Sequence, residues 1–253
     1  MNFHTLVLEG DRKAERDRPH ISVQTKNDYL RRKWLENRPP LHCRSFYLCR
    51  MIEEELGGAR IDGSEKITVC AHRAHVFPGD ETYRRDLAFH VSLYYLEPED
   101  IAVLDKADQN TEPMVMWEIL RKALLDIVER NHGTSKTVEN IEQAFARILD
   151  SGFVREERIS RLTKRAGNTG FTAQVYRILS SEKGEGWYVQ IVDRRGELLC
   201  RTAIDERTRY VDRLGSRLYA KAEWQGDAFV IRERFGKEVF RIDVSESIED
   251  ESS

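Results

Sequence analysis

Three strand-like segments joined by short turns fill residues 171–203, which read FTAQVYRILSSEKGEGWYVQIVDRRGELLCRTA. The turn Asp193 to Gly196 separates the second segment from the third. Successive strands that short turns connect pair side by side in antiparallel fashion. The same pattern continues to residue 244, so this part of the chain predicts an antiparallel β-meander. The expected strands are 171–179, 186–193, 197–203, 217–224, 228–235 and 238–244.

Two amphipathic helices are expected just before this sheet. The first carries apolar residues at helical spacing from Trp117 to Val128. Thr134 or Ser135 caps the second, which ends at Gly152. Because the connection between them is short, the two helices should lie side by side and antiparallel.

The first 110 residues predict an α/β part. A short strand is expected near residues 3–8, and helices are expected over residues 45–56 and 98–106. Residues 66–77 and 86–96 are interpreted as the two arms of a hairpin. In the second arm, Leu87, Phe89 and Val91 alternate with polar or small residues, which predicts that they share one face of a strand.

The whole chain is therefore predicted to be an α+β protein of two domains. Residues 1–110 form an α/β domain whose role the sequence leaves open. Residues 111–253 form the second domain, with helices in 114–150, strands in 171–244 and an acidic tail at 245–253.

Composition excludes several classes of protein. The chain has 253 residues, of which 40% are hydrophobic and 34% are charged, so it has enough apolar material for a core. It contains no apolar stretch of about 18 residues and does not begin like a signal peptide, which predicts a cytoplasmic protein without a membrane partner. The spacing of its four cysteines matches no metal site, so we expect no cofactor and no metal.

Two short motifs have the form His-x-Ser-apolar. They are His20–Ser22 and His90–Ser92, each followed by an apolar residue. On a strand, such a pair points to one side and can aim an imidazole and a hydroxyl at one phosphate. This arrangement resembles the two-histidine phosphoesterases, and it makes an enzyme one alternative interpretation.

A basic segment follows the two helices. Residues 155–165 hold five cationic side chains and only two carboxylates. Together with the helices and with a wing tip at 167–170, residues 114–179 can be read as a winged helix that binds nucleic acid through its phosphates. The cationic residues are Arg155, Arg158, Arg161, Lys164 and Arg165. Glu139, Glu142 and Asp150 on the second helix oppose this interpretation because carboxylates repel DNA.

Residues 114–244 show a resemblance of a different kind. A helix that begins with Trp117 is followed by a helix that ends at residues 149–153, then by the segments 173–176, 186–198, 222–231 and 239–242. This order is similar to a family of bacterial immunity proteins from polymorphic toxin systems. The resemblance implies a protein without catalytic activity that neutralises a cognate toxin by direct binding. It leaves the binding face, the toxin's activity and the oligomeric state open.

Aromatic residues of the sheet are candidates for partner contact. Such a partner would be recognised through complementary charge and a few buried anchors. The candidate anchors are Trp187, Tyr188, Trp224 and Phe229. Alternation with Ala222 places Trp224 on an inward face, and most of these aromatic residues are expected in the core.

Overall fold

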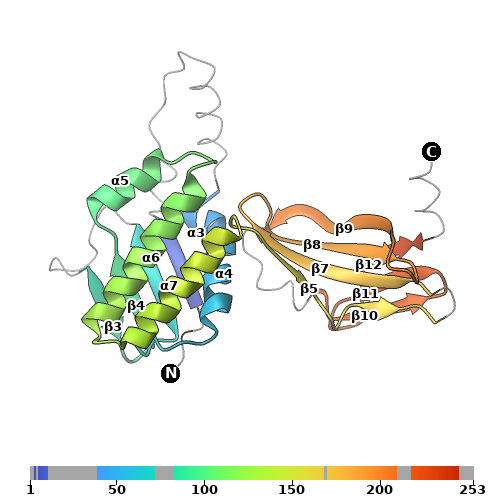
Figure 1. Ribbon diagram of the computed structural model, residues 1–253, viewed down its shortest axis with the longest axis horizontal. Coiled ribbons are helices and arrows are strands. Elements are labelled where there is room, and N and C mark those ends of the chain that lie inside the picture. Colours follow the sequence, from blue (N-terminus) through green and yellow to red (C-terminus); the bar gives the residue numbers. More distant parts are fainter. Residues whose placement is uncertain are drawn as a thin grey trace, which may run out of the picture. The chain divides into compact units, whose positions relative to one another are not determined.

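The computed structural model describes residues 3, 5–10, 39–71, 82–167, 170–209 and 218–244, without the side chains of residues 205–209. The chain forms two compact units, residues 1–154 and 155–253 (Figure 1). Helices and antiparallel or mixed sheets are both present, which confirms the α+β class. The acidic tail at 245–253 lies outside the described residues.

A four-stranded mixed sheet organises the first unit. The strand order is β1-β2-β4-β3, in which β1, β2 and β4 are parallel and β3 is antiparallel to β4. The strands are β1 (Thr5–Gly10), β2 (Lys66–Ala71), β3 (Tyr83–Asp86) and β4 (Val91–Tyr95). β2 is buried at five successive positions, as expected for an inner parallel strand that is covered on both faces.

The helices described in this unit accompany the sheet (Figure 1). They are α3 (Leu41–Arg44), α4 (Phe46–Leu56), α5 (Pro98–Lys106), α6 (Glu112–Arg130) and α7 (Ser135–Asp150). The Thr134 side chain caps α7 by accepting a hydrogen bond from the Thr137 N–H. The Trp117 indole donates a 3.0 Å hydrogen bond to the Phe145 carbonyl, so α6 and α7 are neighbours, as predicted.

The helix pair belongs to the first unit, which differs from the expected division into residues 1–110 and 111–253. Arg147 of α7 forms an ion pair with Glu55 of α4 at 2.5 Å, and Glu112 of α6 forms a buried pair with Arg44 of α3. The sequence shows that each helix has an apolar stripe, but a stripe alone does not indicate which core it faces. The observed division falls after Val154.

The expected hairpin between residues 66–77 and 86–96 is wrong. β2 pairs with β4 in parallel, and the antiparallel partner of β4 is β3. Residues 87–90 form the turn of that β3–β4 hairpin, so Leu87 and Phe89 are exposed instead of sharing a buried face. The alternation was real, but the Asp86 carboxylate accepts hydrogen bonds from the backbone N–H groups of Ala88 and Phe89 and thereby stabilises a turn. Residues 72–77 of the expected first arm lie outside the described residues.

Two antiparallel sheets make up the second unit. The larger has the order β5-β7-β8-β9, with β6 also paired to β7, and the smaller has the order β10-β11-β12. The larger sheet contains β5 (Arg155–Arg158), β6 (Lys164–Arg165), β7 (Thr172–Ser180), β8 (Gly184–Val192) and β9 (Leu198–Arg209). The smaller contains β10 (Lys221–Gln225), β11 (Ala228–Arg232) and β12 (Glu238–Asp243). The predicted meander is confirmed, whereas β5 and β6 were not predicted because they are short and charged.

One hydrophobic core joins the two sheets of this unit. Val175, Val189 and Ile191 come from the larger sheet, and Phe229 and Ile231 come from the smaller. Because side chains alternate along a strand, each sheet turns one face to this core and the other face outward. The second unit therefore presents two outer sheet faces, and they differ in chemistry.

Candidate partner-binding surface

A ladder of stacked side chains crosses the outer face of the larger sheet. Tyr176 of β7 and Tyr188 of β8 are directly opposite in the strand register. Their ring centroids are 5.0 Å apart and the ring planes differ by 9°, which is a parallel stack. The Tyr176 hydroxyl donates to the Gln174 side chain on the same face of β7 at 2.8 Å, which fixes that ring.

Arg201 of β9 completes the ladder. Its guanidinium carbon lies 3.9 Å from the centroid of the Tyr188 ring, within the range of a cation–π contact. The Glu156 carboxylate of β5 lies 3.8 Å from the Arg201 guanidinium, too far for a hydrogen bond. Within the part of the chain that the structure describes, the Arg201 guanidinium donates no hydrogen bond, and half of its side chain is exposed. We call Tyr176, Tyr188, Arg201 and Glu156 the tyrosine face.

Burial holds the centre of the tyrosine face in one protonation state. Tyr188 is only 6% exposed, and this burial, together with the nearby Glu156 carboxylate, raises the pKa of Tyr188. The phenol therefore stays neutral across the physiological range. Because so little of the ring remains accessible, Tyr188 offers no free face on which another ring can stack.

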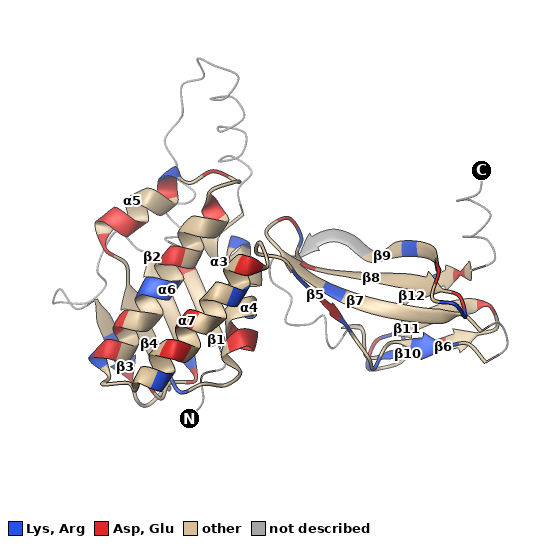
Figure 2. Ribbon diagram, in the orientation of Figure 1, with Lys and Arg blue, Asp and Glu red and all other residues tan. Residues whose placement is uncertain are grey.

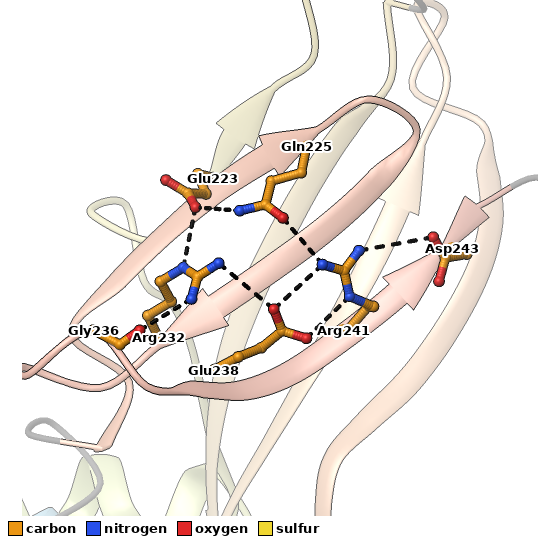
Figure 3. A network of polar contacts seen from close by, with 7 residues as sticks. All are labelled: Glu223, Gln225, Arg232, Gly236, Glu238, Arg241 and Asp243. Atoms are coloured by element: carbon orange, nitrogen blue, oxygen red, sulfur yellow. Dashed lines mark hydrogen bonds and ion pairs between the residues drawn. The ribbon is translucent and has the colours of Figure 1, made fainter.

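The outer face of the smaller sheet carries a closed network of ion pairs and hydrogen bonds (Figure 3). Arg232 donates from Nε to Glu223 at 3.1 Å and from Nη1 to the Gly236 carbonyl at 3.0 Å. Arg241 contacts Glu238 through Nε at 3.0 Å and the Gln225 side chain through Nη2 at 3.0 Å. Both guanidinium groups are thus held by groups of the same sheet.

Further contacts close this network. Arg232 Nη2 lies 3.6 Å from Glu238, and Arg241 Nη1 lies 4.0 Å from Asp243. Hydrogen bonds from Gln225 and Arg232 lower the pKa of Glu223. Val230 of β11 is directly opposite Glu223 of β10 and Arg241 of β12 in the strand register, and its side chain is fully buried. We call Glu223, Gln225, Arg232, Glu238, Arg241 and Asp243 the charged lattice.

Basic and acidic residues are interspersed along the strands of the second unit (Figure 2). The five basic residues singled out in 155–165 are distributed over β5, β6 and the segment between these strands. Arg161 donates to the carbonyls of Tyr219 and Ala220 at 2.8 and 3.1 Å, so it holds the start of β10. Arg155 and Arg158 lie on β5, and Lys164 and Arg165 lie on β6. The helices of the expected winged helix belong to the first unit and its strands to the second, and residues 168–169 of the wing tip lie outside the described residues.

The second His-x-Ser motif does not form the expected pair on one strand face. His90 has a φ of 52° in the turn before β4, so the alternation that aligns residues i and i+2 does not extend to it. Ser92 is fully buried, donates to the Asp62 carboxylate, and lies 2.7 Å from the Ser64 hydroxyl. His20 and Ser22 lie outside the described residues.

No three potential ligands gather into a metal site among the residues that the structure describes. None of the four cysteines forms a disulfide, and Cys49, Cys70 and Cys200 are buried. Burial raises the pKa of Cys49 and of Cys70 to about 12, so both remain protonated thiols of low reactivity. None of the described helices has the length and apolar character needed to cross a membrane.

Of the four candidate anchors, only Tyr188 lies on an outer face. Trp187 and Phe229 belong to the core, and Trp224 packs against it with its indole donating to the Lys164 carbonyl at 3.0 Å. Tyr176 and Arg201 were not predicted. The spacing could have indicated Tyr176, since Tyr176 and Tyr188 are equally far from the turn that joins β7 to β8, but it gives no signal for Arg201.

Comparison of the chain with protein-family models, with curated proteins and with solved structures found no match.

Proposed function

We propose that this protein is a non-catalytic protein-binding module that acts in the bacterial cytoplasm and neutralises a cognate toxin by direct binding. The observation that carries the proposal is Arg201, which is fixed over Tyr188 while its guanidinium donates no hydrogen bond to any residue that the structure describes. Tyrosine and arginine are enriched at the energetic centres of protein interfaces. A side chain that is already ordered loses little conformational entropy on binding.

The chemistry of this surface favours a protein partner that presents carboxylates. A guanidinium group binds a carboxylate through two parallel hydrogen bonds, which gives both affinity and orientation. The charged lattice offers no equivalent site, because its two guanidinium groups already contact groups of their own sheet. We therefore assign the toxin-binding role to the tyrosine face.

The test takes the protein encoded by the gene next to that of this chain as the candidate toxin. Co-expression of the wild-type chain should restore growth, and the two purified proteins should form a stable complex. Arg201→Ala should weaken the complex by about thirtyfold, the value of an interface arginine at about 2 kcal/mol. Arg241→Ala is the matched control, because it removes the same group from the other sheet face, and it should leave affinity unchanged. Failure of the wild-type chain to bind the toxin or to restore growth would overturn the proposed function. Equal effects of the two variants would exclude the tyrosine face as the toxin-binding surface.

Single-stranded nucleic acid is a second candidate partner. Arg158 of β5 is directly opposite Tyr176 in the register, and basic residues beside aromatic rings bind such strands. Affinity for an oligonucleotide should then fall steeply with added salt and fall again in Arg158→Ala and in Lys164→Ala/Arg165→Ala. Absence of binding at low salt would eliminate this candidate. The Glu156 carboxylate and the small exposed area of Tyr188 favour the protein partner.

A further inference from the structure

The tip of the β3–β4 hairpin exposes two large apolar side chains. Leu87 is 66% exposed and Phe89 is 78% exposed, and they lie two residues apart in the four-residue turn 87–90. Single exposed apolar residues are common on protein surfaces. Leu87 and Phe89 lie on one short turn and instead form a small exposed apolar patch on the first unit.

This turn is held in one conformation by its own hydrogen bonds. The Asp86 carboxylate accepts from the backbone N–H of Ala88 at 3.0 Å and from that of Phe89 at 3.1 Å. His90 then adopts the left-handed conformation, with a φ of 52°, and leads the chain into β4. Leu87 and Phe89 are therefore presented by an ordered backbone.

Both strands of the hairpin are tied to a buried polar cluster. The Tyr83 hydroxyl of β3 donates to Asp62 at 2.8 Å and accepts from the Asn131 side chain, which follows α6, at 3.1 Å. From β4, the Ser92 hydroxyl donates to the same Asp62 carboxylate. Asp62 is only 8% exposed, so these contacts are shielded from water. The hairpin is rigid at its base as well as at its tip.

Positive charge borders the apolar tip. Arg84 and Arg85, the two central residues of β3, are exposed. Asp86, the acidic residue that directly follows these arginines in the sequence, accepts hydrogen bonds from the backbone of the turn through one carboxylate oxygen. The combination of an apolar patch and a basic flank is complementary to an apolar pocket with carboxylates at its rim.

We propose that Leu87 and Phe89 insert into an apolar pocket with an acidic rim on the toxin, as a second contact on the first unit. This inference rests on the proposed toxin-binding function. A protein pocket fits the observations better than a lipid surface, because peripheral membrane binding uses a long apolar face and the tip has only two large apolar side chains. The arginines accelerate association, and the apolar pair slows dissociation.

The experiment measures binding of the full-length chain to the same toxin by calorimetry. Leu87→Ser/Phe89→Ser should weaken the complex by at least about tenfold. Phe235→Ser is the matched control, since Phe235 is 90% exposed in a turn of the second unit, and it should not change affinity. Both variants should melt at the wild-type temperature because they remove exposed side chains. In stopped-flow kinetics, Arg84→Glu/Arg85→Glu should slow association at low salt more than at high salt, and an equal effect at both salt concentrations would contradict the role of the two arginines.

The outcomes separate the two proposals. A wild-type chain that does not bind the toxin overturns the proposed function. If the wild-type chain binds the toxin, and Arg201→Ala weakens binding but Leu87→Ser/Phe89→Ser leaves it unchanged, only the hairpin proposal is overturned. Retention of the wild-type chain on phosphatidylglycerol vesicles, lost in Leu87→Ser/Phe89→Ser, also overturns the hairpin proposal and indicates a lipid surface.

Discussion

The two outer faces of the second unit differ in how they engage their arginines. On the charged lattice, Arg232 and Arg241 each contact several groups of their own sheet. On the tyrosine face, Arg201 is positioned by a ring and keeps its donors available within the described structure. A partner would have to displace hydrogen bonds to use the arginines of the lattice, whereas among the described residues Arg201 has only the Tyr188 ring and the more distant Glu156 carboxylate beside it. The contrast shows that exposed charge indicates a binding surface only where its hydrogen bonds are not already made.

The largest expected effect comes from removing the ring at the centre of the tyrosine face. Tyr188→Ala deletes a side chain that is 94% buried and contacts both Tyr176 and Arg201. We expect the free energy of unfolding to fall by about 3 kcal/mol, as for other buried aromatic residues. Chemical denaturation measures this change. Tyr188→Phe, which keeps the ring, should remain within about 1 kcal/mol of the wild type, and a loss as large as that of Tyr188→Ala would contradict the packing role of the ring.

A smaller effect, on toxin affinity, is expected when the guanidinium of Arg201 is replaced by another group of the same charge. Arg201→Lys keeps the positive charge but loses the planar group that stacks on Tyr188 and binds a carboxylate through two hydrogen bonds. We expect the affinity for the toxin to fall by about tenfold, measured by calorimetry. Arg241→Lys on the lattice should leave affinity unchanged. Full affinity of Arg201→Lys would mean that charge alone acts at this position.

Opening the lattice tests the other side of the comparison. Glu238→Ala removes the carboxylate that contacts both Arg232 and Arg241. The melting temperature should fall only slightly, because exposed ion pairs contribute little to stability. Toxin affinity should not change, although two guanidinium groups lose a partner. A loss of affinity would show that the lattice also contacts the toxin.

The smallest expected effect is on the pH dependence of stability, in which the tyrosine face responds at alkaline pH and the charged lattice at acid pH. The raised pKa of Tyr188 contributes stability that is present below about pH 10, the ordinary phenol pKa, and is lost as pH rises further toward its value in the folded protein. The lowered pKa of Glu223 contributes stability that is present above its ordinary value and is lost as pH falls through its folded value. Tyr188→Phe should flatten the alkaline limb of a melting-temperature profile, and Glu223→Gln should flatten the acid limb. The reverse assignment would contradict both pKa directions.

The second unit was predicted well because its signals are local. Each strand from β7 to β12 shows alternation or a nearby turn, and short turns define which strands are neighbours. The first unit was predicted less well, because nothing near β2 in sequence shows that it pairs with β4 in parallel. Leu87 and Phe89 continued the alternation of β4, but the Asp86 side chain stabilised a turn at that point.

The candidate site was predicted only in part. Tyr188 was among the expected anchors, whereas its stack with Tyr176 depends on the register of β7 and β8. The position of Arg201 over the ring depends on β9 as well, which alternation within one strand does not reveal. The catalytic interpretation of His90 and Ser92 relied on a strand that begins one residue too late to include His90.

The parallel pairing of β1 with β2 has a consequence for the order in which the chain folds. Thr5 pairs with Lys66, so all the residues between them must leave the ribosome before β1 can pair with β2. The neighbouring strands β7 and β8, in contrast, close across a turn as soon as they are made. Pairing between strands that are far apart in the sequence is slow, so β1 remains unpaired during synthesis. A chaperone that covers the unpaired strand would therefore aid folding of the first unit far more than that of the second.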